Sequence, residues 1–284
     1  MALVTLNEVL PQAKKGHYAL GAFDTMDFTL TEGICQASEQ TGKPVILMFG
    51  GFSFDRADTR SILDFNLYRA RRATTPIVYH LDHGSYEQCF RAIHAGASSV
   101  MFDGSALPME ENIEKTKRIV EAAHIAGVSV EAEIGHVAPS SGSVEGDEAN
   151  PDRFTRVEDA VRFVTETGID ALAVAFGTVH GDYKGEPHLD LARLQAINDA
   201  VDVPLVMHGG SGLSDQDFKD AIAHGISKVN FFTALARSAM SGYDKVYQET
   251  AGKARYINFY DGGLEASVAC VKQQMEIFGT PSIF

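Results

Sequence analysis

Eight short apolar runs recur along the chain, and segments with the character of helices separate them. The runs span residues 18–23, 44–50, 76–82, 99–105, 129–135, 171–177, 204–210 and 226–232. Parallel strands that are covered on both faces are near-continuous apolar runs of this kind. The pattern therefore predicts an α/β protein whose strands run parallel to one another.

The intervening segments have the spacing and the ends of helices. In 109–126 the apolar positions fall on one stripe, and a glycine follows as a stop. In 214–224, Ser214 and Asp217 match a capping box at the start of the helix. Both segments are therefore predicted to be helices that pack against the strands.

Eight strand–helix units follow one another without a Pro/Ser-rich linker. This order predicts a closed (β/α)8 TIM barrel that residues 1–284 form as a single domain. The segment 264–284 exceeds what a minimal barrel needs and predicts extra C-terminal helices. A doubly wound open sheet is the alternative architecture.

The charge balance limits the partners. The chain has 24 Lys and Arg residues against 38 Asp and Glu residues, a formal net charge of -14. Such a surface repels phosphate backbones and anionic lipids, so we expect neither nucleic acid nor a membrane as partner. The apolar runs fall short of the ~20 residues that span a bilayer, and Glu8 comes too early for a signal peptide. Three widely spaced cysteines do not make a disulfide framework, so we expect a cytoplasmic protein.

Polar residues stand at the end of nearly every predicted strand. They are Asp24, Asp82, His83, Asp103, Glu131, Glu133, His180, His208 and Asn230. In a (β/α)8 barrel the carboxyl ends of the strands carry the chemistry. Fold stability does not account for polar residues at so many strand ends, so the pattern predicts an enzyme.

Three of the ten histidines are delivered to this mouth by different strands, namely His83, His180 and His208. Three imidazoles leave a tetrahedral Zn²⁺ with one open position, as in catalytic zinc sites. A single histidine is more often a core or surface group, but three at converging strand ends favour a metal. His80 lies within its strand and is expected to line the barrel interior.

Asp82 directly precedes His83, so strand alternation is expected to point the two side chains in different directions at the rim. A carboxylate beside a metal acts either as a general acid/base or as a partner that orients an imidazole. The residues themselves leave both roles open.

A glycine-rich stretch, Gly209 to Gly212, precedes the helix that starts near Ser214. Backbone N–H groups in such a loop cradle phosphate, and barrel enzymes often bind phosphate after strands 7 and 8. Gly209 and Ser211 are thus candidate phosphate contacts. Thr233, after strand 8, and Lys184, after strand 6, are candidates for an added hydroxyl and charge.

Six segments together resemble one family. HLDHG (80–84), AGASSVMFDGS (95–105), SVEAEIG (129–135), GTVHGDYK (177–184), PLVMHGGSGLS (204–214) and KVNFFTAL (228–235) are similar to the class II, metal-dependent ketose-bisphosphate aldolases. That family contains the fructose- and tagatose-bisphosphate enzymes, and the match spans roughly residues 5–240. The resemblance implies a barrel aldehyde-lyase that reversibly cleaves a ketose phosphate or bisphosphate to dihydroxyacetone phosphate and an aldehyde through a zinc-stabilised enediolate.

The resemblance also assigns roles to individual residues. It implies His83, His180 and His208 as ligands of one catalytic Zn²⁺, Glu133 at an alternative metal position, and Asp82 as acid/base on the hydroxyl that becomes the aldehyde. It implies phosphate contacts at Gly181, Ser211 and Thr233, and a contact to the enediolate from Asn230. It further implies a monovalent cation, Na⁺ or K⁺, near the backbone of 179–181 and 209–211, and assembly as a homodimer or homotetramer.

The sequence departs from the family pattern at three places. Asp24 stands where the better-known members have Asn. The polar loop 136–155 lacks the Gly-Gly-x-Glu-Asp motif whose first acid moves a proton at the enediolate carbon. Glu145, Asp147 and Glu148 are the candidates for that role, and of these we choose Glu145. Arg255 is the only arginine in the C-terminal stretch where bisphosphate-specific members bind a distal phosphate. We therefore expect a divergent member that acts on a less common sugar or sugar-acid phosphate.

Three alternatives keep the barrel and change the chemistry. Lys228, which points into the barrel, is a candidate for a Schiff base in a metal-free aldolase. A metal-dependent isomerase or epimerase would use the same enediolate without breaking a C–C bond. A catalytically silent barrel that binds a sugar phosphate would agree with the missing loop carboxylate.

Overall fold

The eight apolar runs form eight parallel strands in the structure, which is a computed structural model that describes residues 2–54, 60–135, 137, 153–181, 183 and 185–283. They are β2 (Leu20–Asp24), β3 (Val45–Gly50), β4 (Ile77–Gly84), β5 (Ser99–Phe102), β6 (Ser129–Ile134), β7 (Ala171–Val174), β8 (Leu205–Met207) and β9 (Ile226–Phe231). Each pairs with the next along the chain, and β9 pairs with β2, so the ring closes. The predicted (β/α)8 barrel is confirmed, and the open-sheet alternative is wrong.

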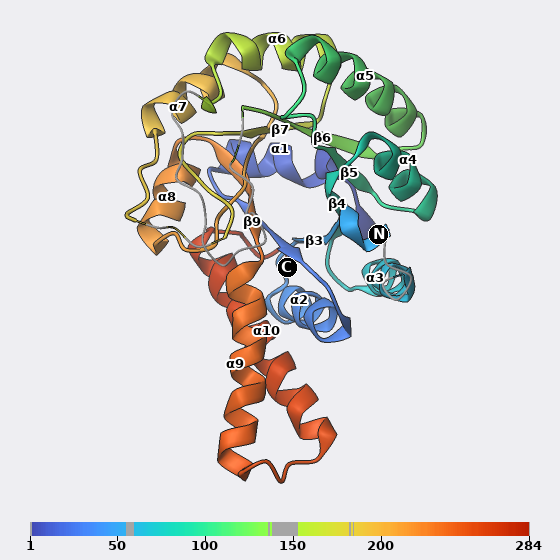
Figure 1. The fold of residues 1–284 in the computed structure, drawn as a ribbon, viewed down its shortest axis with the longest axis vertical. Coiled ribbons are helices and arrows are strands. Elements are labelled where there is room, and N and C mark those ends of the chain that lie inside the picture. The colour runs from blue at the N-terminus through green and yellow to red at the C-terminus, as the bar shows by residue number, and fades with distance from the viewer. Residues whose placement is uncertain are drawn as a thin grey trace.

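Helices surround the ring of strands (Figure 1). They are α2 (Phe28–Thr41), α3 (Arg60–Arg72), α4 (Tyr86–Ala95), α5 (Met109–Ile125), α6 (Val157–Thr167), α7 (Leu191–Ala200) and α8 (Asp215–Ala223), with a short 3-10 turn at Gly51–Phe54. Ser214 caps α8 as predicted, because its side chain accepts a hydrogen bond from the Asp217 N–H. Apolar side chains from the helices and from the outer faces of the strands form the larger hydrophobic core.

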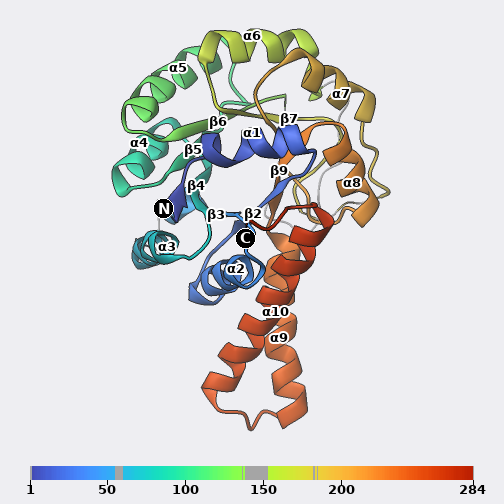
Figure 2. The ribbon, with the colours of Figure 1, turned by 180° about the vertical axis from the view of Figure 1, so that it is seen from behind.

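An N-terminal element that the sequence analysis did not identify closes one end of the barrel (Figure 2). The short strand β1 (Leu3–Val4) pairs with β4, and α1 (Leu6–Gly16) follows it. Leu6, Leu10 and Ala13 of α1 are fully buried and pack against apolar side chains from the barrel interior. This end is therefore filled, and the carboxyl ends of the strands open at the other.

The barrel interior changes character along its axis. Toward α1 it is apolar, with Leu20, Ile46 and Val206 in one cluster. Toward the open end it contains charged side chains with no exposed surface, among them Glu131 and Lys228. Burying charge costs free energy unless the charges are paired, so this layer points to function.

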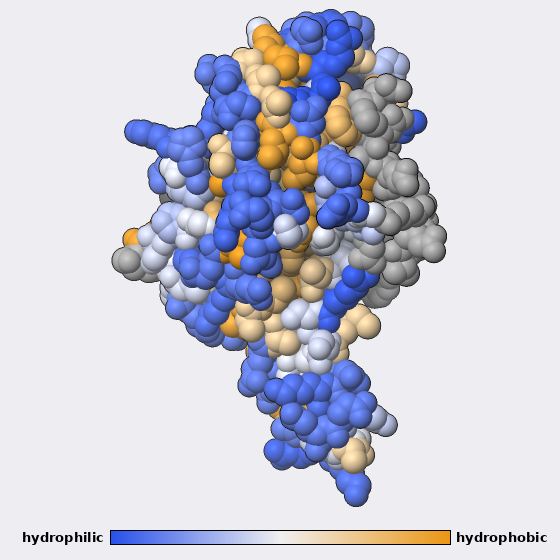
Figure 3. Space-filling view, turned by 90° about the vertical axis from the view of Figure 1, so that its left-hand side faces the viewer, coloured by the Kyte–Doolittle hydropathy of each residue, from blue (hydrophilic) through white to orange (hydrophobic). Residues whose placement is uncertain are grey.

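The predicted extra C-terminal helices are present as α9 (Thr233–Thr250) and α10 (Tyr256–Ile277). They form a hairpin arm that projects from the barrel (Figures 1 and 2), and α10 also packs on α2. The two helices approach closely at Gly242, which has no Cβ. A Cβ at this position would lie 2.2 Å from the Gly262 carbonyl oxygen. On the side seen in Figure 3 the arm is mostly hydrophilic. Within the described ranges, no helix is both long and apolar enough to cross a bilayer.

Candidate active site

The carboxyl ends of the strands surround a cavity of about 410 Å³ at the open end of the barrel. Eight residues expected from the sequence line it: Asp82, His83, His180, Gly181, Gly209, Ser211, Asn230 and Thr233. His208 and Glu133 are buried beside it. The fold thus brings these ten residues together, whereas Glu145 and Lys184 lie outside the described residues.

Three imidazoles meet at this mouth from three strands. His83 lies in β4, His180 follows β7 and His208 follows β8. Their ring centroids are 4.6 Å apart for His83 and His208, 5.0 Å for His83 and His180, and 5.9 Å for His180 and His208. One nitrogen of each ring lies within 4.8 Å of the other two. This spacing allows one metal ion to be bound by all three.

Carboxylates hold two of the rings by their outer nitrogens. His83 Nδ1 lies 2.8 Å from Asp103 Oδ2, and His208 Nε2 lies 3.0 Å from Glu131 Oε1. Because an ionised carboxylate only accepts hydrogen bonds, these nitrogens carry protons. The inner nitrogens, His83 Nε2 and His208 Nδ1, face each other at 3.0 Å. Carboxylates placed in this way behind metal-binding histidines fix the ring orientation.

The charges around the imidazoles favour a cation. Burial lowers the pKa of His83, but the charge of Asp82 and the hydrogen bond to Asp103 outweigh it and raise this pKa to about 10. Burial acts in the opposite sense on Glu133, because it raises the pKa of this carboxyl to about 8 although the charge of His83 lowers it. His83, Asp103 and Glu133 form a second grouping with ligand atoms within 4.8 Å. The donor set and its charge therefore fit a divalent metal ion.

Asp103 and Glu131 were noted at strand ends in the sequence but were given no role. Glu131 is two residues from Glu133, so both point to the same side of β6. Pairing of β6 with β5 and β7 places Glu131 in the interior, in register with Met101 and Ala171. The two-residue spacing of Glu131 and Glu133 could have indicated that Glu131 also faces the interior. Its contact with His208 depends on the register between strands, which one sequence does not reveal.

The backbone at His83 departs from regular strand geometry. Asp82 and His83 were expected to point in different directions, yet both line the cavity. The register of β4 with β5 shifts between Leu81 and Gly84, and His83 has a φ of 45°. A left-handed conformation is costly for a residue with a Cβ. Here it turns the imidazole to the same side as the carboxylate.

Asp82 is linked to the barrel interior through Asn230. The Asn230 Nδ2 donates to Asp82 Oδ1 at 2.9 Å, and Lys228 Nζ donates to Asn230 Oδ1 at 2.7 Å. Lys228 also forms an ion pair with Glu131, with Nζ 2.9 Å from Oε2. A Schiff-base lysine must reach the substrate as a free amine. Lys228 is fully buried and paired, which argues against the Schiff-base alternative.

The glycine-rich loop after β8 packs against the segment after β7. A Cβ on Gly209 would lie 2.3 Å from the Val179 carbonyl oxygen, and its φ of 70° also favours glycine. The Tyr183 hydroxyl donates to the Gly209 carbonyl at 2.9 Å and so joins the two segments. Thr233, the first residue of α9, lies on the same cavity. Backbone N–H groups of a loop and of a helix start are thus available to an anion.

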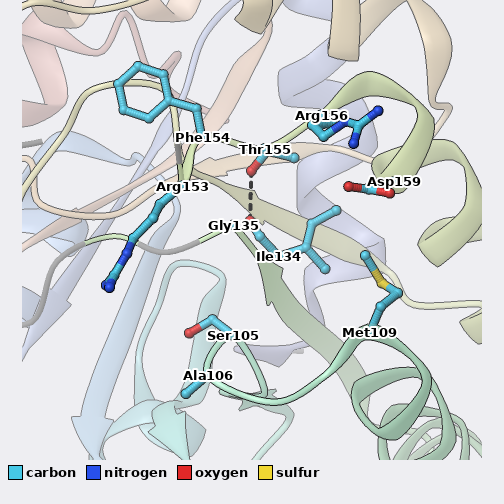
Figure 4. A pocket seen from close by; sticks show the side chains of 10 residues that line it. All are labelled: Ser105, Ala106, Met109, Ile134, Gly135, Arg153, Phe154, Thr155, Arg156 and Asp159. Atoms are coloured by element: carbon cyan, nitrogen blue, oxygen red, sulfur yellow. Dashed lines mark hydrogen bonds between the residues drawn. The ribbon is translucent and has the colours of Figure 1, made fainter. Parts of the chain in front are cut away.

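A second cavity of about 500 Å³ lies beside the ends of β5 and β6 (Figure 4). Ser105, Ile134 and Arg153 are among the residues that line it, and the Thr155 hydroxyl donates to the Ile134 carbonyl at 2.7 Å. The Ser105 hydroxyl donates to Asp103 Oδ1 at 2.7 Å, so this cavity adjoins the carboxylate that holds His83.

Asp24 lines the active-site cavity from the end of β2, and its Oδ1 is buried without a hydrogen-bond partner among the described residues. Burial, reinforced by the charge of Asp82, raises the pKa of Asp24 to about 8, although His83 and Lys228 act in the opposite direction. At neutral pH the metal-free protein therefore holds this carboxyl largely in its protonated form.

We expect Asp24→Asn to stabilise the metal-free protein, and increasingly so as the pH rises. An unperturbed Asp releases its proton near 3.8, but the folded chain keeps it up to about 8. Between these values the unfolded state binds fewer protons, so the unfolding free energy falls with rising pH, by at most about 1.4 kcal/mol per pH unit. The Asn variant lacks this loss. Urea denaturation of EDTA-treated protein at pH 5, 7 and 9 measures the gap, and a gap that stays constant would contradict the assignment.

Comparison with known proteins gives matches over nearly the whole chain. The model of the class-II fructose-bisphosphate aldolase family matches residues 4–282. A 6-phospho-5-dehydro-2-deoxy-D-gluconate aldolase of Bacillus velezensis is 38% identical over 99% of this chain and 97% of its own. A sulfofructosephosphate aldolase of Alkalicoccus urumqiensis is 34% identical over 99% and 98%. The crystal structure of the YdjI aldolase from Escherichia coli K12 is 33% identical, covers 98% of each chain and superposes with a TM-score of 0.86.

Proposed function

Because the chain belongs to the class-II fructose-bisphosphate aldolase family, we propose that it is a zinc-dependent aldolase that forms dihydroxyacetone phosphate and an aldehyde from a ketose phosphate. The observation that carries the zinc site is the set of three imidazoles at one barrel mouth, two of them held by carboxylates. The isomerase and silent-binder alternatives are not favoured, since the relatives named above are aldolases.

His83, His180 and His208 would hold the Zn²⁺, and Glu133 would offer an alternative position with His83 and Asp103. When bound, the ion supplies Lewis-acid polarisation of the substrate carbonyl. Imidazole nitrogens are ligands that zinc accepts readily. We propose in addition a Na⁺ or K⁺ site on the backbone of 179–181 and 209–211, two segments that Tyr183 holds in contact.

Asp82 is proposed to move the proton of the hydroxyl that becomes the aldehyde. The Asn230 amide holds its Oδ1, and the side chain lines the cavity at the height of the imidazoles. Asp82 takes the hydroxyl proton as the C–C bond breaks. The electron pair of that bond stays on the carbon beside the ketone. Asn230 contacts the resulting enediolate. Glu145, which lies outside the described residues, is proposed to return a proton to that carbon.

The phosphate is proposed to bind at Gly181, Gly209, Ser211 and Thr233, with Lys184 as a further contact outside the described residues. The first N–H groups of α9 and the glycine loop offer donors on one side of the cavity. The phosphate does not react, but its binding orients the carbonyl and the C–C bond that do.

For the whole substrate, before cleavage, we propose a less common sugar or sugar-acid phosphate rather than fructose or tagatose bisphosphate. Arg153 and Ser105 line the second cavity and offer a cation and a hydroxyl next to the Asp103 side of the mouth (Figure 4). The names of the two relatives cited above refer to a phosphorylated gluconate derivative and a sulfofructose phosphate.

We further propose that the whole chain works as one barrel domain in the cytoplasm and assembles as a homodimer or homotetramer. The buried thiols Cys35 and Cys89 suit a reducing compartment. The projecting arm exposes large apolar or aromatic side chains, with exposed fractions of 67% for Met240 and 87% for Tyr256. Where such side chains form a contiguous patch, the patch often marks a contact between subunits.

The first test is a half-reaction that does not require the aldehyde. Purified protein with dihydroxyacetone phosphate in D₂O is expected to exchange a carbon-bound proton, which NMR detects, because the site forms the enediolate without a partner. EDTA is expected to abolish the exchange, and added Zn²⁺ to restore it. Exchange that survives EDTA would contradict the metal-dependent route.

A further inference from the structure

Lys228 occupies the centre of a buried chain of polar contacts beneath the cavity. Its side chain has no exposed surface, and neither it nor Glu131 is among the residues that line the cavity. A buried lysine and carboxylate are costly in the core of a barrel that could be filled by apolar side chains. Their contacts on both sides suggest what they are retained for.

On one side the ammonium group acts on one proposed metal ligand, His208, through Glu131. Lys228 Nζ lies 2.9 Å from Glu131 Oε2 and 3.2 Å from Glu131 Oε1. Glu131 Oε1 in turn accepts the Nε2 proton of His208 at 3.0 Å, which leaves Nδ1 directed at His83. The lysine thus holds the carboxylate that sets which nitrogen of His208 is offered to the metal.

On the other side it acts on the acid/base. An ammonium group only donates hydrogen bonds, so the Asn230 oxygen must face Lys228, at 2.7 Å. The amide nitrogen of Asn230 then faces Asp82 and donates to its Oδ1 at 2.9 Å. With the amide turned over, Asn230 would present an oxygen to the carboxylate and repel it. Lys228 therefore fixes the orientation of the amide that holds Asp82.

We propose that Lys228 is a positioning residue that aligns the metal ligand His208, through Glu131, and the acid/base Asp82, through Asn230, from a single buried ammonium group. The inference rests on the proposed function, because it needs His208 to bind a metal. It assigns to Lys228 a role that requires no contact with substrate.

The test compares wild type with Lys228→Met and with the double variant Lys228→Met/Glu131→Gln. The double variant removes both buried charges together, and its glutamine oxygen can still accept from His208, so we expect it to fold even if the single variant does not. Lys43→Met is the matched control, because Lys43 is also largely buried and paired, with Glu276, away from the mouth. For each protein, the affinity for Co²⁺ is measured by competition with a chelating indicator, and condensation of dihydroxyacetone phosphate with an accepted aldehyde is measured at saturating Co²⁺.

We expect Lys228→Met to bind Co²⁺ roughly 10–100-fold more weakly, the loss typical when a partner behind a metal ligand is removed. In the double variant we expect wild-type stability but a condensation rate lower by about tenfold or more at saturating Co²⁺, with KM for dihydroxyacetone phosphate little changed. The loss of rate persists in the double variant because no ammonium group fixes the orientation of the Asn230 amide, which holds Asp82. Lys43→Met should match wild type in both measurements.

A double variant that regains both wild-type Co²⁺ affinity and wild-type condensation would overturn the proposal, since Lys228 would then only balance the charge of Glu131. The same holds for a folded Lys228→Met variant that matches wild type. Wild-type protein that binds Co²⁺ but does not exchange would instead count against the proposed function, and the affinities would still decide the role of Lys228. Wild-type protein that does not bind Co²⁺ would overturn both.

Discussion

Replacement of His180 with alanine is expected to remove the metal ion and, with it, cleavage. The three imidazoles arise from separate strands, so loss of one leaves two of the three histidine ligands. His180 lines the cavity, whereas His208 is fully buried and bonded to Glu131, so the His180 variant disturbs the barrel interior less. We expect a loss of affinity beyond the roughly 10–100-fold that removal of an outer partner causes.

Metal content after dialysis and the rate of dihydroxyacetone phosphate exchange measure this effect. His94→Ala serves as the control, because His94 is an exposed histidine of α4 that is outside the active-site cavity. If His180→Ala retained a full equivalent of zinc and full activity, the three-histidine assignment would be wrong.

Replacement of Asp82 with alanine is expected to separate metal binding from cleavage. The variant keeps all three imidazoles and the carboxylates at Asp103 and Glu131, so it should retain zinc. It loses the group that takes the hydroxyl proton, and general acid/base groups contribute roughly 10²–10⁴-fold to a rate. The kcat for cleavage or condensation should fall by that factor.

Exchange of dihydroxyacetone phosphate is the internal control for Asp82→Ala, because that step does not involve the hydroxyl on the aldehyde half. We expect exchange to continue while condensation with an accepted aldehyde is lost. Loss of zinc together with activity would assign Asp82 to the support of an imidazole, the second role that the sequence left open.

The strands and the three histidines could be predicted because each depends on local sequence. A parallel strand covered on both faces is a near-continuous apolar run. The polar residues that follow such a run therefore mark the carboxyl end of the strand. The helix α1 was missed although Glu8 accepts from the Thr5 N–H at 2.8 Å, a capping box that is visible as T-L-N-E. What it covers is decided by tertiary packing.

The contacts around the histidines could not be predicted because they depend on register between strands. Asp103 reaches His83 only because β4 is irregular before Gly84 and His83 adopts a positive φ. Lys228 was considered as a nucleophile because its strand position places it inside the barrel. Only its ion pair with Glu131 and its hydrogen bond to Asn230 show that its ammonium group is held below the cavity.

The arm has a mechanical consequence for the substrate site. Helix α9 begins with Thr233, the proposed phosphate contact at the cavity, and runs for 18 residues, or about 27 Å. A single helix thus connects the wall of the cavity to the outer part of the arm. In the assembly proposed above, a subunit bound at the outer end of the arm would also restrain the first turn of α9, and assembly and phosphate binding would then be coupled through this helix.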